Sequence, residues 1–277
     1  MSSLDLKLPS RIVCLTEETT EWLYVLGQQD RIVGISGYTV RPPEARKEKP
    51  RISAFLSAKI DEILALKPDH VFGFSDLQAD IASSLIRNGV PVTIFNQRSV
   101  EEIFSMLYQV GCLVGQAVEA VRQIELIQAH LKCVQTKASS FKVRPKVYFE
   151  EWDSPCISGI KWVSELVEIA GGQDCFPELA AQSLAKNRII HDEGLVIERN
   201  PDIIIGSWCG KKFRSELVAK RSGWSTISAV KNQQLFEIKS PFILQPGPAA
   251  LTDGVDQIHQ IIDNWQIYQS KYTRIPY

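Results

Sequence analysis

The stretch from Ile60 to Phe74, IDEILALKPDHVFGF, joins a helical pattern to an apolar strand through a Pro-Asp turn. Apolar residues recur at helical spacing as far as Leu66, and the residue before Pro68 disfavours the α conformation, so the helix is predicted to end there. The apolar run that follows predicts a short buried strand. A similar element recurs at Asn200–Gly206, NPDIIIG, where Pro-Asp again precedes an apolar strand. Helix and strand in alternation form the unit of a parallel α/β sheet.

The same alternation extends along most of the chain. In the first half, strands are predicted at Arg11–Leu15, Arg31–Ser36, His70–Phe74 and Pro91–Phe95, helices at Glu17–Leu26, Ile60–Leu66 and Leu77–Arg87, and a loop at Gly37–Pro50. In the second half, strands are predicted at Lys146–Trp152, Asp202–Trp208 and Gln234–Ile238, and helices at Val163–Ala170 and Asp253–Tyr268. This order predicts an α/β fold with two Rossmann-like lobes, each built on a parallel, doubly wound sheet.

A long helical segment separates the two halves. Apolar residues keep helical spacing from about residue 99 to 137, with Gly111 and Gly115 predicted to divide the segment into two helices. The second, Ala117–Thr136, would be about 30 Å long. We therefore expect an N-terminal lobe at residues 1–114, a connecting helix at 115–140 and a C-terminal lobe at 141–277.

The charge balance limits the possible partners. Lys and Arg number 31, Asp and Glu number 32, and the net charge is −1. A surface that binds nucleic-acid phosphates needs an excess of basic residues, so nucleic acid is excluded as the main partner.

The N-terminal residues indicate in which cellular compartment the protein is expected. The segment MSSLDLKLPSRIVCL contains Asp5, Lys7 and Pro9. A secretory signal needs an apolar stretch of about 7–15 residues, and a transmembrane helix needs about 20. Neither is visible, so we expect the chain as it stands to be cytoplasmic, and periplasmic if a signal has been removed.

Familiar catalytic and metal-binding motifs are missing from the sequence. There is no GxGxxG, no Walker A motif and no GxSxG elbow. The six Cys include no CxxC pair, and the four His lack the HExxH pattern, so zinc is not expected and the thiols are expected to be reduced. We expect no catalytic residues and no catalytic cofactor.

Aromatic residues cluster where the predicted strands end. Tyr38, Trp152, Trp208 and Phe242 all follow or close such strands. Ligands of open α/β sheets bind outside the carboxyl ends of the strands. Aromatic side chains there offer a wide contact surface, which suits a large, flat and uncharged ligand.

Five segments carry a resemblance to a known family. They are RIVCLTEETTEWLYVLG, IDEILALKPDHVFGF, GIKWVSELVEIAGG, ERNPDIIIGSWCGKK and ILQPGPAALTDGVDQI. With the long helix, they make the chain resemble the cobalamin-binding branch of the substrate-binding proteins of cobalamin and iron-siderophore ABC importers, in which one long helix joins two α/β lobes. The resemblance implies a non-enzymatic protein that binds cobalamin or a related corrinoid between its lobes, for uptake or for handling inside the cell.

The resemblance also implies roles for individual residues. The expected ligand-binding residues are Tyr38, Phe55, Trp152, Trp162, Trp208, Phe242 and Gln245. For Trp162, packing within the lobe is an equal alternative. Relatives dock on a membrane permease through one acidic residue per lobe, and the candidates here are Asp61 or Glu62 and, on the second lobe, Glu216. The protein is expected to be a monomer.

Two alternatives remain open at this point. The first keeps the fold and changes the ligand to a ferric siderophore or haem, for which Lys211, Lys212 and Arg214 would supply positive charge. The second is a cytoplasmic enzyme that acts on a corrinoid or another tetrapyrrole. Its candidate catalytic groups are Cys209, His191 and Asp192.

Overall fold

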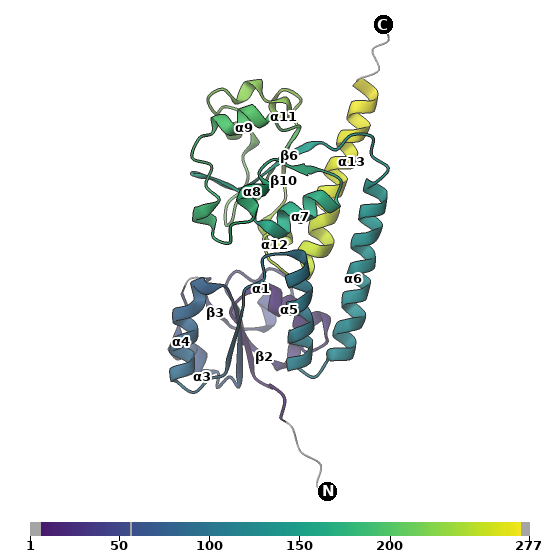
Figure 1. The fold of residues 1–277 in the computed structure, drawn as a ribbon. Coiled ribbons are helices and arrows are strands. Elements are labelled where there is room, and N and C mark those ends of the chain that lie inside the picture. Colours follow the sequence, from purple (N-terminus) through teal and green to yellow (C-terminus); the bar gives the residue numbers. More distant parts are fainter. Residues whose placement is uncertain (1–6, 56, 273–277) are drawn as a thin grey trace. The chain divides into compact units, whose positions relative to one another are not determined.

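The computed structural model describes residues 7–55 and 57–272, which divide into two compact units (Figure 1). The N-terminal unit extends to Gln97 and includes Glu101–Leu126, and the C-terminal unit contains Arg98–Val100 and the chain from Ile127 onward. The long helix α6, Ala117–Ala138, therefore contributes its first part to one unit and its second part to the other. This division differs from the predicted one, in which the helix stands apart from both lobes.

The N-terminal unit is built on a five-stranded parallel sheet in the order β3-β2-β1-β4-β5. The strands are β1 Ile12–Cys14, β2 Ile32–Ser36, β3 Arg51–Ser53, β4 His70–Phe74 and β5 Val92–Phe95. The predicted parallel α/β arrangement is confirmed, although β3 lies in a stretch for which no strand was predicted.

Helices cover both faces of this sheet. They are α1 Glu17–Val25, α2 Ala45–Glu48, α3 Ile60–Ala65, α4 Ala79–Arg87 and α5 Val100–Leu113, with short turns η1 Gln29–Arg31 and η2 Asp76–Gln78. Val13 and Leu15 alternate with residues of the opposite face and pack in one core cluster with Ile63 and Leu85 of the helices α3 and α4. Helix α2 corrects the prediction of a loop throughout Gly37–Pro50, because a single helical turn is too short to show a period.

The C-terminal unit holds a second five-stranded sheet. Its order is β10-β9-β6-β7, and β8 also pairs with β6. The strands are β6 Lys146–Asp153, β7 Cys156–Ser158, β8 Gln173–Asp174, β9 Ile203–Gly206 and β10 Leu235–Glu237. The pairing of β6 with β7 is antiparallel, which corrects the expectation of a purely parallel sheet. A two-residue connection, Ser154 and Pro155, turns the chain back on itself, as only antiparallel neighbours allow.

Helix α7, Lys161–Ile169, and the C-terminal helix α13, Val255–Tyr272, pack against each other in this unit. The remaining helices and turns are α8 Pro177–Ala180, η3 Ala185–Asn187, α9 Gly194–Arg199, α10 Ser215–Val218, η4 Trp224–Thr226, α11 Ser228–Lys231, α12 Ser240–Ile243 and the π-helical turn η5 Ala250–Gly254. Most of these elements are single turns that had not been predicted.

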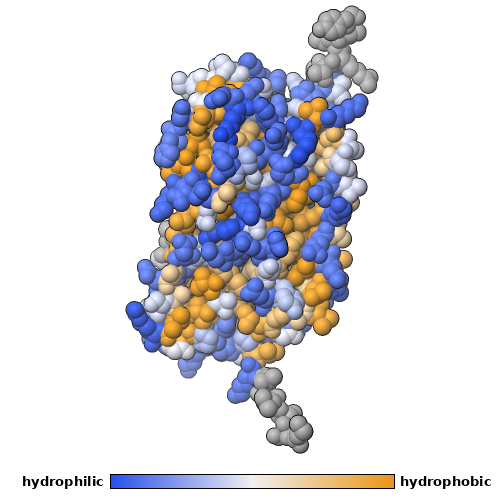
Figure 2. Space-filling model, in the orientation of Figure 1, coloured by the Kyte–Doolittle hydropathy of each residue, from blue (hydrophilic) through white to orange (hydrophobic). Residues whose placement is uncertain are grey.

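The surface contains both apolar and polar side chains. On the face shown in Figure 2, apolar and polar side chains are interspersed over both units. Within residues 7–55 and 57–272, no helix combines the length and the apolar character that a membrane span requires.

Candidate ligand-binding surfaces

Two tryptophans lie at the carboxyl ends of neighbouring strands in the C-terminal unit. Trp152 belongs to the end of β6, and Trp208 follows β9 by two residues. The ring of Phe213 supports Trp208 in an edge contact, with the ring centroids 5.0 Å apart. This packing needs a glycine at position 206, because a Cβ there would lie 1.8 Å from Phe213. The local sequence therefore fixes the position of the Trp208 ring.

A buried carboxylate orients the same indole. Glu150 is 0% exposed, and its Oε1 accepts a hydrogen bond of 3.0 Å from Nε1 of Trp208. Arg221 donates to both carboxylate oxygens at 2.5 and 3.0 Å. The hydroxyl of Tyr148 donates to Oε2 at 3.0 Å, and burial raises the pKa of Tyr148 well above its usual value, so this hydroxyl stays neutral. Four donated hydrogen bonds thus compensate the buried charge of Glu150.

The ammonium group of Lys211 lies over both indoles. Its Nζ is 4.2 Å from the ring centroid of Trp152 and 5.0 Å from that of Trp208. Both distances are within the range of a cation–π interaction. The same ammonium donates to Asp153. We call Trp152, Trp208 and Lys211 the indole surface.

Several basic side chains around the indole surface are paired with acidic ones, while Lys212, beside Lys211, is exposed. Besides the pairs of Arg221 and Lys211, Arg214 pairs with Glu216 at 2.8 Å, and the buried Arg188 pairs with Glu151 at 2.6 Å. Arg188 also donates to the backbone carbonyls of Ser158, Gln182 and Ser183. These ion pairs keep the local net charge small.

Phe242 and Gln245 are both half-buried, in and just after α12. Helix α12 packs closely against η5, where a Cβ on Gly254 would approach the carbonyl oxygen of Phe242 to 2.4 Å. The ligand-binding role of both residues stays a prediction.

Trp162 is 3% exposed, and its indole N–H donates to the carbonyl of Ile243 at 2.9 Å. This environment is that of a packed core residue. Its alternative role in ligand binding stays a prediction.

We expect Trp162→Phe to lower the free energy of unfolding by about 1–2 kcal/mol, because it leaves a buried carbonyl without its donor and a small cavity. Urea denaturation of the variant and the parent protein measures the difference. A midpoint unchanged within error would contradict the packing role.

In the N-terminal unit, Phe55 lies after β3, with its ring centroid 6.4 Å from that of Phe74 at the end of β4. The side chain of Gln78 joins the two segments: its Nε2 donates to the carbonyl of Phe55, and its Oε1 accepts from the backbone N–H of Phe74, both at 3.0 Å. Tyr38 follows β2 and is 55% exposed. Aromatic residues therefore also lie at the carboxyl ends of this sheet.

Three glutamates mark the start of α1, directly after β1. Glu17, Glu18 and Glu21 are all buried, and Oε2 of Glu18 has no hydrogen-bond partner. Burial, followed by repulsion from the neighbouring carboxylates, raises the pKa of Glu17 to about 8. Burial likewise raises the pKa of Glu18 to about 7, although Thr16 donates a hydrogen bond to it. Near neutral pH this cluster holds protons that free carboxylates would have lost.

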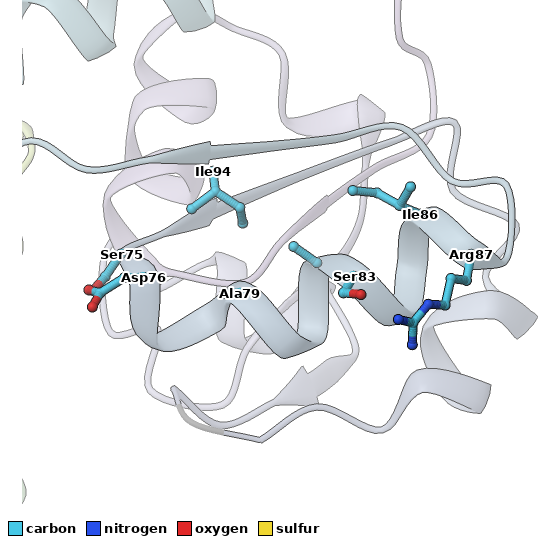
Figure 3. A pocket seen from close by; sticks show the side chains of 8 residues that line it. Ser75, Asp76, Ala79, Ser83, Ile86, Arg87 and Ile94 are labelled. Carbon is cyan, nitrogen blue, oxygen red and sulfur yellow. The ribbon is translucent and has the colours of Figure 1, made fainter.

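A cavity of about 500 Å³ lies between α4 and β5 (Figure 3). Ser75 and Asp76 lie at one end and Arg87 at the other, with Ile86 and Ile94 between them. None of the predicted ligand-binding residues lines it. We therefore assign it no role in binding the ligand.

The predicted docking residues are exposed. Asp61 and Glu62 lie in the first turn of α3, where Glu62 pairs with Lys59 at 2.8 Å, and Glu216 lies in the first turn of α10. Their positions are compatible with docking, which stays a prediction.

The candidate catalytic groups form no recognisable site. His191 and Cys209 are exposed, and Asp192 accepts a hydrogen bond from the backbone N–H of Gly194 at 2.8 Å. All six thiols are free, and burial raises the pKa of Cys14 and Cys156 to about 12, which makes them poor nucleophiles. Among the described residues, no group of three His, Cys, Asp or Glu side chains is arranged to hold a metal ion.

Sequence reasoning missed Glu150 and Arg221, and considered Lys211 only as a source of charge for a siderophore. The sequence does contain one indication that Glu150 has a basic partner. The strand KVYFEEWD carries two acidic residues directly after an apolar run, and a carboxylate that continues a buried strand needs a basic partner. The identity of that partner is visible only in the fold.

Comparison with known proteins agrees with this architecture. A family model described as "Periplasmic binding protein" matches residues 12–242. The uncharacterized ABC transporter substrate-binding lipoprotein YvrC of Bacillus subtilis is 26% identical over 270 residues, which cover 92% of this chain and 81% of that protein. The vitamin B12-binding protein of Vibrio parahaemolyticus is 23% identical over 243 residues, with coverages of 87% and 85%. The periplasmic heme-binding protein RhuT from Roseiflexus sp. RS-1 shares the fold, with a TM-score of 0.77 at 20% identity over 91% of this chain and 99% of that one.

Proposed function

Because the chain belongs to the periplasmic binding protein family, we propose that it binds a corrinoid of the cobalamin type without transforming it and delivers it to the permease of an ABC importer. Two relatives bear on this proposal. One is named a vitamin B12-binding protein, and the other an ABC transporter substrate-binding lipoprotein.

The observation that carries the proposal is the indole surface. Trp152, at the end of β6, is partly buried and offers an apolar face with few rotatable bonds, which suits a rigid macrocycle. Trp208 is 4% exposed and belongs to the core cluster against which Trp152 packs. Trp208 is fixed by Phe213 and Glu150 within the core, so the side chains under Trp152 are already ordered before a ligand binds.

The charge distribution favours a corrinoid over a ferric siderophore that carries several negative charges. Such a ligand would need several uncompensated basic side chains. Around the indole surface, Lys211, Arg214 and Arg221 each have a carboxylate partner. A ligand with many amide groups and little net charge matches this surface better.

Delivery to a permease would use the exposed acidic residues of the two units, Asp61 or Glu62 and Glu216. All three are accessible in the first turns of their helices. Negative charge at these positions would attract basic residues of a membrane partner.

Calorimetric titration with cyanocobalamin tests the ligand assignment. We expect a dissociation constant in or below the micromolar range, which corresponds to about −8 kcal/mol. Haem and a ferric siderophore serve as comparison ligands. Absence of cyanocobalamin binding at about 100 μM, or about −5.5 kcal/mol, would reject the proposal.

A further inference from the structure

Lys211 differs from the other basic residues of the C-terminal unit that surround the indoles. The side chain of Arg221 is 15% exposed and donates to a fully buried carboxylate at two points. The side chain of Lys211 is 40% exposed, and that of its partner Asp153 is 21% exposed. Lys211 also follows Gly210, whose φ of +77° marks a sharp turn with open space around it. Of the two cations, Lys211 is the one that can move.

The position of Lys211 has a consequence for any flat ligand of this surface. Its ammonium lies over the faces of both indoles, 4.2 and 5.0 Å from their centroids. Trp208 is 4% exposed, so Trp152, which is partly buried, is the indole of this pair that a ligand can reach. A macrocycle that stacks on the Trp152 face must displace the ammonium, which gives up its cation–π contacts. A charged group near an apolar ligand is costly unless an anion accompanies it. The ammonium is paired with Asp153, and an anionic group at the edge of the ligand would offer it a second partner in its displaced position.

We propose that Lys211 binds an anionic arm of the ligand, so that this site selects a macrocycle carrying a phosphodiester or a carboxylate at its edge. The proposal rests on the proposed function. Asp153 holds the ammonium while the site is empty, and the anionic arm replaces Asp153 as the partner when the ring covers Trp152. Arg221 stays paired with the buried Glu150 and takes no part in this exchange.

The source of the anion can be distinguished with matched ligands. Cyanocobalamin carries a phosphodiester in its nucleotide loop, and dicyanocobinamide lacks that loop. Haem carries two propionates, which are uncharged in its dimethyl ester. For each pair, the measured quantity is the ratio of the two dissociation constants.

We expect the parent protein to bind cyanocobalamin about tenfold more tightly than dicyanocobinamide, as one hydrogen bond between charged groups would give. Lys211→Met keeps the length and apolar stem of the side chain and removes its charge, and should lower the ratio to about one. Asp153→Asn releases the ammonium and should raise the ratio. Lys231→Met, an exposed change in α11, is the control and should leave the ratio at about tenfold.

The experiment distinguishes a wrong role for Lys211 from a wrong proposed function. If the parent protein binds corrinoids and Lys211→Met leaves the ratio unchanged, the role of Lys211 is wrong and the proposed function stands. If only the haem pair binds, and Lys211→Met removes the preference for free propionates, Lys211 recognises a carboxylate and the corrinoid assignment is wrong. If neither pair binds, both proposals are wrong. Thermal melting of each variant checks that it is folded.

Discussion

Replacing Glu150 with Met is expected to lower the free energy of unfolding of the C-terminal unit by about 3–5 kcal/mol, the usual cost of removing one partner of a buried ion pair. Glu150 is completely buried and receives hydrogen bonds from Arg221, Trp208 and Tyr148. The variant would leave a guanidinium without its anion and two further donors without an acceptor. Urea denaturation followed by tryptophan fluorescence measures the effect, because five of the six Trp lie at or beyond position 152.

A double-mutant cycle isolates the ion pair. The combined variant Glu150→Met and Arg221→Met removes both charges, so it should lose much less stability than the sum of the two single variants. Glu216→Met breaks an exposed ion pair with Arg214 and should leave the unfolding midpoint unchanged. Equal effects of Glu150→Met and Glu216→Met would contradict the role of Glu150 in organising the indole surface.

The N-terminal unit is expected to lose stability as the pH rises from about 4.5 to about 8. The pKa of Glu17 is raised to about 8 and that of Glu18 to about 7, in both cases chiefly by burial. The unfolded chain, with ordinary carboxyl pKa values, releases these protons at lower pH than the folded chain does. Their contribution is therefore most favourable below pH 4.5 and is lost progressively up to pH 8. The loss is at most several kcal/mol for each of the two carboxyls, at about 1.4 kcal/mol for each pKa unit.

Glutamine substitution tests this dependence. Glu17→Gln and Glu18→Gln remove the titrating group, so each should flatten the fall in unfolding free energy between pH 5 and pH 9, and should stabilise the protein at the alkaline end. Urea denaturation followed by circular dichroism across this range gives the profile. Glu62→Gln, an exposed change in α3, is the matched control and should keep the profile of the parent protein. A parent profile that rises over this interval would contradict the burial of the two carboxyls.

The long elements of the fold were predictable because their signals are local. The helical spacing that ends before Pro68 and the apolar run after it reappear as α3 and β4, and the long helical pattern reappears as α5 and α6. Single-turn helices such as α10 and α12 escaped prediction, since four residues do not establish a period. The antiparallel strand β7 was not predicted for a similar reason: a three-residue strand is too short for its sequence to indicate that it is a strand or how it pairs.

The candidate site was only partly predictable. Aromatic residues at strand ends can be read from the sequence, and Trp152 and Trp208 lie where the strand pattern predicts them. The contact between Glu150 and Arg221 joins residues 71 positions apart, and no local pattern carries that information. The same holds for Lys211, whose relation to the two indoles depends on the turn at Gly210.

The dissociation constant of cyanocobalamin for the parent protein and for Trp152→Ala tests the central claim most directly. Trp152 is only partly buried, so its removal should alter the ligand contact more than the folding of the unit. We expect a loss of affinity of at least about tenfold, since truncation of a central aromatic residue in a binding site costs about 2 kcal/mol or more. Tyr108→Ala, an exposed aromatic residue of α5, is the control and should bind like the parent protein. Equal affinities of the parent protein and Trp152→Ala would contradict the indole surface as the place where the ligand binds.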